Sequence, residues 1–275
     1  MADLSTGTHA LYRAVRGRLS GLASGAARKD WTNPFAVARE KWSEVPLGND
    51  AREHSRRLLE LPDAALLEKW EAARNRDTVG PGFGIRGWYH ALYRDIVAGK
   101  RLLDIGCGLG LSSITFAEYG AKVTFVDLAP DNVEVVRRLC HLKGIAAEFR
   151  VLDRIGDLDS LPDEFEVVTA LGSLIHAPLP VTQAEVDRLL PHLASPCRWL
   201  HLAYPKSRWV RDLRPPFWAW GAMTDGKGTP WAEYHDRRKV LALFSGVRVE
   251  LLFECEWHGG DFNWFDLEIR SARSA

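Results

Sequence analysis

The chain of 275 residues is long enough for one large domain, or one domain with an extension, because domains usually contain about 100–200 residues. Its composition, 46% hydrophobic and 26% charged, is typical of a folded globular protein and excludes a disordered or fibrous chain. The 36 basic and 36 acidic residues cancel, so the chain lacks the positive charge of a general nucleic-acid binder.

The sequence carries no signal for a membrane span, for secretion or for a metal site. No stretch approaches the ~18 consecutive apolar residues that cross a bilayer, and residues 1–30 contain no apolar run typical of a signal peptide. The 4 cysteines lie far apart without CxxC spacing. We therefore expect a cytoplasmic protein with no membrane partner and no bound metal.

The first 78 residues predict a helical N-terminal extension. Apolar residues recur at helical spacing over 4–22, in an Arg-rich segment that would pack on its own domain or mediate oligomer formation through these N-terminal helices; it also resembles a transit peptide. Further helices are expected from residue 34, over 52–61 after Asn49 as a cap, and over 63–70. A glycine-rich loop at 79–87 and a helix over 88–98 follow.

From residue 100 onward, short apolar runs alternate with helical segments, which predicts an α/β domain over 79–275. Continuous apolar strands separated by helices are typical of a parallel sheet covered on both faces. The last two runs, at 248–257 and 262–272, are joined by a link too short for a helical crossover and predict an antiparallel hairpin. The fold class is therefore a doubly wound, seven-stranded, mostly parallel sheet with a C-terminal antiparallel hairpin.

The most informative segment is the run LLDIGCGLG at 102–110, a buried strand that enters a glycine turn and then a helix. Glycines allow the sharp turn and the close approach of a ligand to the backbone. Asp127 ends the next strand, about twenty positions after the first glycine, where a carboxylate can accept hydrogen bonds from a ribose. A dinucleotide enzyme would need a third glycine where this sequence has Leu111.

This segment resembles the first motif of the class I S-adenosylmethionine-dependent methyltransferases, and the resemblance extends over about residues 80–272. It implies S-adenosylmethionine as cofactor and S-adenosylhomocysteine as product. The family implies that the glycine turn lines the amino-acid end of the cofactor, that Asp127 binds the ribose, and that Asp153 meets the adenine amino group. The implied cofactor-binding residues are Tyr89, Asp104, Gly106, Cys107, Gly108, Gly110, Asp127, Leu128, Asp153, Arg154 and Leu171, with Arg86 as a second candidate for the cofactor carboxylate.

The acceptor should lie at the carboxyl ends of the fourth and fifth strands. His176 follows the fourth and is the candidate general base, because imidazole accepts a proton near neutral pH; it could equally be a packing or capping histidine. Residues 205–235, hereafter the lid segment, show no regular pattern and predict an acceptor-side insertion. Candidate acceptor-binding residues are Ser173, Tyr204, Trp209 and Trp231, although packing is the simpler role for any one tryptophan.

These features predict methyl transfer from S-adenosylmethionine to an oxygen, or secondly a nitrogen, of a small molecule. The predominance of Arg over Lys suggests a GC-rich coding sequence, which fits secondary or sugar metabolism. Two alternatives stay open: a nicotinamide-dependent oxidoreductase, and a protein that binds S-adenosylmethionine for regulation or assembly without turnover. No nucleic-acid partner is expected.

Overall fold

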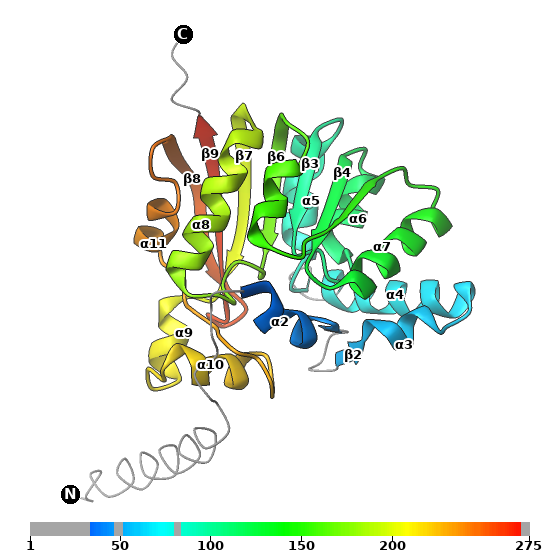
Figure 1. Ribbon diagram of the computed structural model, residues 1–275, viewed down its shortest axis with the longest axis horizontal. Helices are drawn as coiled ribbons and strands as arrows, with labels where there is room; N and C mark the ends of the chain where they lie inside the picture. Colours follow the sequence, from blue (N-terminus) through cyan, green and yellow to red (C-terminus); the bar gives the residue numbers. More distant parts are fainter. Residues whose placement is uncertain (1–33, 47–51, 80–83, 271–275) are drawn as a thin grey trace, which may run out of the picture.

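The computed structural model describes residues 34–46, 52–79 and 84–270 (Figure 1). The helix expected at 4–22 and the cap expected at Asn49 lie outside these residues. Within them, no helix combines the length and the apolar character needed to cross a bilayer.

A seven-stranded sheet occupies the centre of the molecule (Figure 1). Its spatial order is β5-β4-β3-β6-β7-β9-β8, in which β9 runs antiparallel to both neighbours and the other pairs are parallel. The predicted mostly parallel sheet with a C-terminal hairpin is thus confirmed. The strands are β3 (Arg101–Ile105), β4 (Lys122–Asp127), β5 (Glu148–Val151), β6 (Phe165–Leu171), β7 (Leu193–Ala203), β8 (Arg248–Trp257) and β9 (Phe262–Arg270).

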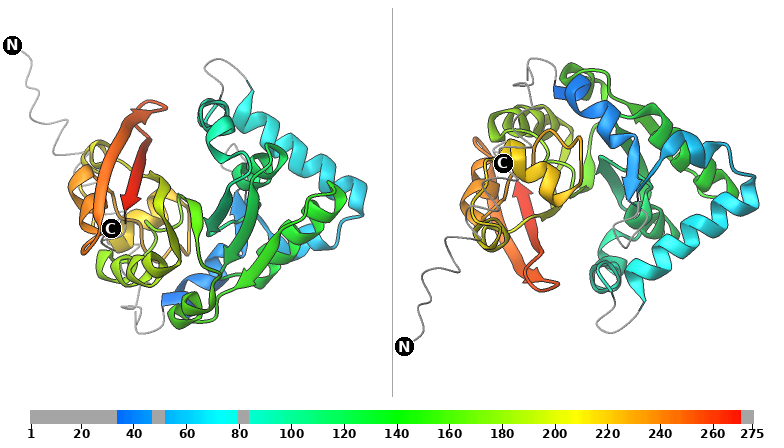
Figure 2. Two further views of the ribbon diagram at one scale, coloured as in Figure 1. Left: turned by 90° about the horizontal axis from the view of Figure 1, so that it is seen from above. Right: turned by 90° about the horizontal axis from the view of Figure 1, so that it is seen from below.

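Helices cover both faces of the sheet, and each face has its own apolar core (Figure 2). Successive strand residues alternate between the two cores: Leu102 packs with one and Leu103 with the other. One face is covered by α4 (Asp63–Thr78), α5 (Gly87–Val97), α6 (Leu111–Glu118) and α7 (Pro130–Leu142). The other is covered by η2 (Ile155–Ser160), α8 (Leu179–Leu189), η3 (Leu190–His192) and α11 (Arg237–Ala242).

The N-terminal extension is not wholly helical. The helix predicted over 52–61 begins only at Ser55, so the prediction was wrong for residues 52–54, which form a strand. After α2 (Pro34–Trp42), the short strands β1 (Glu44–Pro46) and β2 (Arg52–His54) pair antiparallel, and only then does α3 (Ser55–Leu59) begin. The side chain of His54 accepts a hydrogen bond from the Arg56 amide, which fixes the start of α3. We call α2, β1 and β2 the cap segment, because they lie across the lower edge of the sheet in Figure 1.

The lid segment contains two short helices where no regular pattern was predicted. They are α9 (Lys206–Arg211) and α10 (Phe217–Thr224), and each follows a proline at its N-cap, Pro205 and Pro216. Helices of 6 and 8 residues are too short to display the apolar period that identifies longer helices in a sequence. Both lie at the same edge of the sheet as the cap segment (Figure 1).

Candidate active site

A pocket of about 800 Å³ lies at the edge of the sheet where the parallel strands end. Its wall combines the glycine turn after β3, the ends of β4 and β6, the start of the lid segment after β7, and the cap segment. Parallel α/β sheets place ligands at this edge because several loops converge there. The cap segment contributes Phe35, Ala38, Trp42, Glu44, Val45, Pro46 and Arg52.

The glycine turn is shaped by backbone conformations that favour glycine. Gly106 has φ +74, and a Cβ at this position would lie 2.4 Å from the Cβ of Ser173, so a side chain would push the β3 and β6 loops apart. The amides of Gly106 and Cys107 both donate to the Val126 carbonyl, at 2.8 and 3.1 Å. Gly106, Cys107 and Gly108 therefore line the pocket with their backbone.

Two buried carboxylates lie beside this turn. Asp104 accepts a hydrogen bond from the Thr169 hydroxyl at 2.9 Å, and burial raises its pKa to about 6. The two oxygens of Asp127 accept the amides of Gly108 and Ala129 at 2.9 and 2.8 Å. Burial raises the pKa of Asp127, against the opposing effect of these amides. Both carboxylates line the pocket, and Asp127 fixes the glycine turn to the end of β4.

Most of the predicted site residues converge on this pocket. In addition to the glycine turn and its carboxylates, these are Leu128, Leu171, Ser173, His176 and Tyr204. The Ser173 hydroxyl oxygen is buried and has no hydrogen-bond partner in the described part of the chain. A buried polar atom without a partner, next to the glycine turn, fits a polar ligand such as the amino-acid end of S-adenosylmethionine.

Six predicted residues lie outside the pocket wall. The side chains of Asp153 and Arg154 are 76% and 81% exposed, and Asp153 pairs with Arg39 at 2.8 Å. Tyr89 lies behind the wall, where its hydroxyl bonds Arg86 and Ser112, which do line the pocket. The remaining three are Gly110, which caps α6, and the lid residues Trp209 and Trp231.

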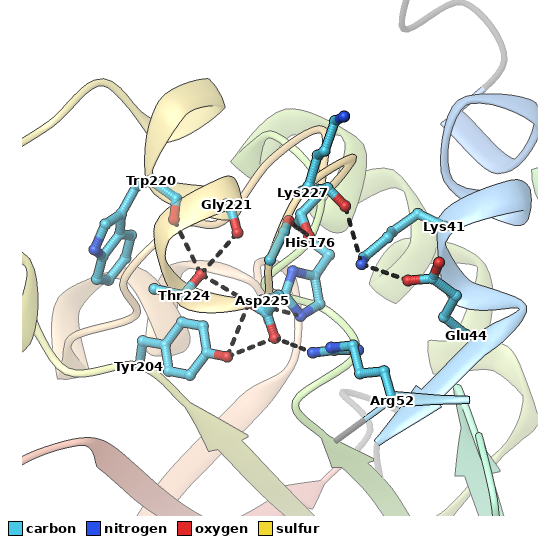
Figure 3. Close-up of polar contacts among 12 residues, drawn as sticks. Lys41, Glu44, Arg52, His176, Tyr204, Trp220, Gly221, Thr224, Asp225 and Lys227 are labelled. Carbon is cyan, nitrogen blue, oxygen red and sulfur yellow. Dashed lines mark hydrogen bonds and ion pairs between the residues drawn. The ribbon is translucent and has the colours of Figure 1, made fainter. Parts of the chain in front are cut away.

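His176 lies in the wall between the cap segment and the lid segment (Figure 3). Its Nδ1 is 3.1 Å from the Trp231 carbonyl oxygen, which can only accept, so Nδ1 carries the proton and Nε2 holds the lone pair. The ring packs on Trp42, with centroids 4.1 Å apart. Burial lowers the pKa of His176 below its usual value, so the ring is neutral at pH 7.

Asp225, at the end of α10, forms the centre of a polar cluster beside His176 (Figure 3). Its carboxylate is 2.9 Å from the Tyr204 hydroxyl, 2.7 Å from the Thr224 hydroxyl and 3.0 Å from Arg52 Nη2. Its Oδ2 lies 4.0 Å from His176 Nε2. Burial, and then the Asp225 charge, raise the pKa of Tyr204, which keeps this hydroxyl protonated as a donor.

Sequence reasoning missed Trp42, Arg52 and Asp225. Arg52 and Trp42 belong to the cap segment, far from any motif, and nothing in their spacing indicates a site. Asp225 precedes Gly226, Lys227 and Gly228 in the lid segment, where a turn residue is the simplest interpretation. No cluster of three or more His, Cys, Asp or Glu suited to a metal occurs in the described residues.

A family model described as a methyltransferase domain matches residues 102–195, which run from β3 into β7. This part of the chain is thus similar to a methyltransferase domain, within a sheet whose strand order is the one that the class I resemblance implies. The resemblance inferred from the glycine turn and Asp127 is thereby confirmed, and so is the strand order implied by it.

Curated relatives match the methyltransferase domain over part of their length. A ubiquinone biosynthesis O-methyltransferase of Bordetella parapertussis is 36% identical over 104 residues, 38% of this chain and 42% of the relative. The enzyme of the same name from Xanthomonas euvesicatoria is 42% identical over 85 residues, 30% of this chain and 35% of the relative. The matches thus span less than half the length of these relatives.

Solved structures share the fold of the methyltransferase domain. The magnesium protoporphyrin IX methyltransferase of Synechocystis, with bound S-adenosylhomocysteine, superposes with a TM-score of 0.52 at 19% identity, over 78% of this chain and 92% of that one. The N-methyltransferase NodS of Bradyrhizobium japonicum gives a TM-score of 0.50 at 13% identity, over 73% and 98%. At these identities the likeness concerns the fold alone.

Proposed function

We propose that the chain transfers a methyl group from S-adenosylmethionine to a hydroxyl oxygen of a small-molecule acceptor. The observation that carries this proposal is that one pocket joins the glycine turn and Asp127 to the imidazole of His176. A binding protein without turnover would have no use for a neutral base beside the cofactor loop. The named O-methyltransferase relatives favour oxygen, and nitrogen is the second choice.

Residues of this chain fit each end of the cofactor. Gly106, Gly108 and the Ser173 hydroxyl would bind the amino-acid end, and Arg86 its carboxylate. Asp127 would accept the ribose hydroxyls, since each carboxylate oxygen has capacity beyond its one amide partner. When bound, S-adenosylmethionine supplies a methyl group on a sulfonium sulfur. Leu171 keeps the binding role that the family resemblance implies. Tyr89 would act through Arg86, and Gly110 through the start of α6, whereas the exposed Asp153 and Arg154 are assigned no cofactor contact.

His176 would act as the general base. Its Nε2 lone pair accepts the acceptor proton as the acceptor oxygen bonds to the methyl carbon and the carbon–sulfur bond breaks, leaving S-adenosylhomocysteine. The Asp225 carboxylate, 4.0 Å away, stabilises the imidazolium that forms. The pocket wall holds donor and acceptor together and excludes water, which removes most of the entropic cost of their encounter.

The acceptor side would be formed by Tyr204 and the lid segment, with Trp209 and Trp231 as further candidates for acceptor contact. Ser173, predicted from the sequence to bind the acceptor, lies against Gly106 and is assigned to the cofactor instead. The pocket volume of about 800 Å³ and the balanced charge favour a small molecule over a nucleic acid. We retain an acceptor from secondary or sugar metabolism, a cytoplasmic location and an oligomer formed through the N-terminal helices as parts of the proposal.

The first test is calorimetric titration of the protein with S-adenosylhomocysteine and, separately, with NAD. We expect micromolar affinity for S-adenosylhomocysteine, lost in Asp127→Ala, and no binding of NAD. Mass spectrometry of mixed small-molecule acceptors with S-adenosylmethionine should then detect a product heavier by one methylene unit. Binding of NAD instead would favour the oxidoreductase, and binding without any product would favour a regulatory protein.

A further inference from the structure

Three arginines line the pocket in the described part of the chain, and they differ in how their charge is balanced. Arg52 pairs with Asp225 at 3.0 Å, and Arg86 pairs with Asp77 at 2.9 Å. Arg208 forms no close ion pair with a carboxylate in the described part of the chain. Its charge reaches the Asp261 carboxylate only at longer range, where burial raises the pKa of Asp261 and the Arg208 and Arg211 charges help to lower it overall. The Arg208 guanidinium is therefore less fully neutralised than the other two.

Arg208 lies in α9, immediately after β7, and two contacts hold it in place. Its Cζ lies 4.4 Å from the centre of the Tyr204 ring, so the guanidinium stacks on the aromatic face. Its Nη1 donates to the Asp261 carbonyl oxygen at 3.2 Å, which leaves Nε and Nη2 without partners in the described residues. The Asp261 carboxylate is itself occupied by Arg211 and by His258.

The position of Arg208 assigns it to the acceptor side of the pocket. The Tyr204 ring that it covers lies 6.3 Å from the His176 ring and bonds Asp225 through its hydroxyl. The distance from the Arg208 guanidinium to the His176 ring is therefore at most the sum of two distances, from Arg208 to the Tyr204 ring and from that ring to the His176 ring. One substituted aromatic ring can bridge this span. Arg86, in contrast, bonds Ser112 on the helix that follows the glycine turn.

We propose that Arg208 binds an anionic oxygen group, a carboxylate or a phosphate, at the end of the acceptor opposite the methylated hydroxyl. A half-buried guanidinium without a close ion pair gains from such a ligand, because hydrogen bonds between two charged groups are stronger than neutral ones. This inference rests on the proposed function, since it assumes that the acceptor occupies the pocket beside His176. The acceptor class is thus a small hydroxylated acid.

The test compares ligands that differ only in the anionic group. The probes are 4-hydroxybenzoate, its neutral analogue 4-hydroxybenzamide, and 4-hydroxyphenyl phosphate, titrated against the full chain with and without S-adenosylhomocysteine by ligand-observed NMR. We expect an anionic probe to bind at least 10-fold more tightly than the amide, because hydrogen bonds between two charged groups are stronger than those that a neutral amide can form. Whether the carboxylate or the phosphate binds more tightly identifies the anion.

Substitutions in α9 distinguish a role of Arg208 in binding the anion from a role in packing. Arg208→Gln should reduce the preference for the anionic probe to less than 3-fold, and Arg208→Lys should keep most of it. The matched control is Lys206→Gln, since Lys206 lies on the same helix, contacts the ring of Tyr234 and does not line the pocket. This control should keep the preference of the wild type.

The proposal is overturned if the wild type shows no preference, if Arg208→Gln keeps it, or if Lys206→Gln loses it equally. A purely structural role of Arg208 would weaken anionic and neutral probes alike and would leave their ratio unchanged. Failure of the proposed function has a different result: the wild type itself would not bind S-adenosylhomocysteine. Retained S-adenosylhomocysteine affinity in each variant shows that it is folded.

Discussion

His176 Nε2 lies 4.0 Å from Asp225 Oδ2, although one residue belongs to the loop after β6 and the other ends α10 in the lid segment. Asp225 is fixed by Tyr204, Thr224 and Arg52, which come from three separate elements. The negative charge beside the imidazole is therefore placed by the tertiary fold, and it acts against the burial that lowers the pKa of His176.

Asp225→Asn should lower kcat about 10-fold or more, because the imidazolium formed during proton transfer would lose its nearby charge. Asp225 is a positioning residue in this scheme, so the pKa of the kinetic acid limb should also move downward. Steady-state rates over pH 5–9 measure both effects. Asp212→Asn is the control, since Asp212 bonds Trp220 within the lid segment and can still accept that hydrogen bond as an amide.

His176→Gln should lower kcat by about 100-fold or more and remove the acid limb of the pH profile. Burial holds the pKa of His176 below 6.5, so the wild-type rate should be flat at neutral pH and should fall only as the pH drops through that lowered pKa. The same rate measurements over pH 5–9 test both the loss of kcat and the position of the acid limb. An acid limb that survives in His176→Gln would assign the base to another group.

Gly106→Ala should be far more damaging than Gly108→Ala. Both glycines have positive φ, which costs an alanine about 1–2 kcal/mol, but only the added Cβ at Gly106 meets another residue, Ser173, at 2.4 Å. Urea unfolding should show a loss of about 1 kcal/mol for Gly108→Ala and a clearly larger loss for Gly106→Ala. Equal losses would mean that the contact with Ser173 relaxes without cost.

Asp153→Asn should change the affinity for S-adenosylhomocysteine by less than 3-fold, whereas Asp127→Asn should reduce it by more than 10-fold. The Asp153 side chain is 76% exposed and pairs with Arg39, while Asp127 is buried in the pocket wall. Calorimetric titration of the two variants in parallel measures the difference. A large loss in Asp153→Asn would restore the adenine contact that the family resemblance implies.

Acid should destabilise the protein through a buried pair of histidines. His201 and His235 are fully buried, stack at 5.1 Å and share one hydrogen bond of 3.0 Å. Burial lowers the pKa of His201 to about 3 and that of His235 well below its usual value. The folded state therefore stays neutral while the unfolded chain takes up protons below about pH 6.5, so stability falls as the pH drops from about 6.5 toward 3.

Each histidine of this pair should contribute up to ~1.4 kcal/mol of destabilisation per pH unit in that window. Urea unfolding at pH 7, 6 and 5 measures the slope. The double variant His201→Phe/His235→Phe should show a slope reduced by about 2–3 kcal/mol per pH unit. An unchanged slope would show that other groups control the acid sensitivity.

The sheet was predictable because its strands are short continuous apolar runs. β8 matches its predicted limits, and β9 begins at the predicted residue. The cap segment was not predictable, because β1 and β2 have only 3 residues each and depend on pairing with one another. The helices of the lid segment depend on their contacts with the core in the same way.

The cofactor side of the site was predictable and the acceptor side was not. Gly106 and Asp127 are marked by a local pattern, because the turn and the strand end are each formed by consecutive residues. The cluster of Arg52, His176 and Asp225 brings together three distant parts of the chain, and only the fold juxtaposes them. Asp153 follows the family pattern in sequence, yet its side chain turns toward Arg39 and solvent.

The cap segment touches the two sides of the pocket in different ways, and this difference bears on how acceptor choice can evolve. Toward the cofactor side, Arg39 bonds the backbone carbonyls of Leu128 and Leu152, which any residue would supply, and its one side-chain partner there, among the described residues, is the exposed Asp153. Toward the acceptor side, Trp42 and Arg52 meet the side chains of His176 and Asp225. Substitutions at Trp42 and Arg52 can therefore change which acceptors the pocket binds and leave the cofactor-binding residues unchanged. Directed evolution of acceptor specificity should start from this segment.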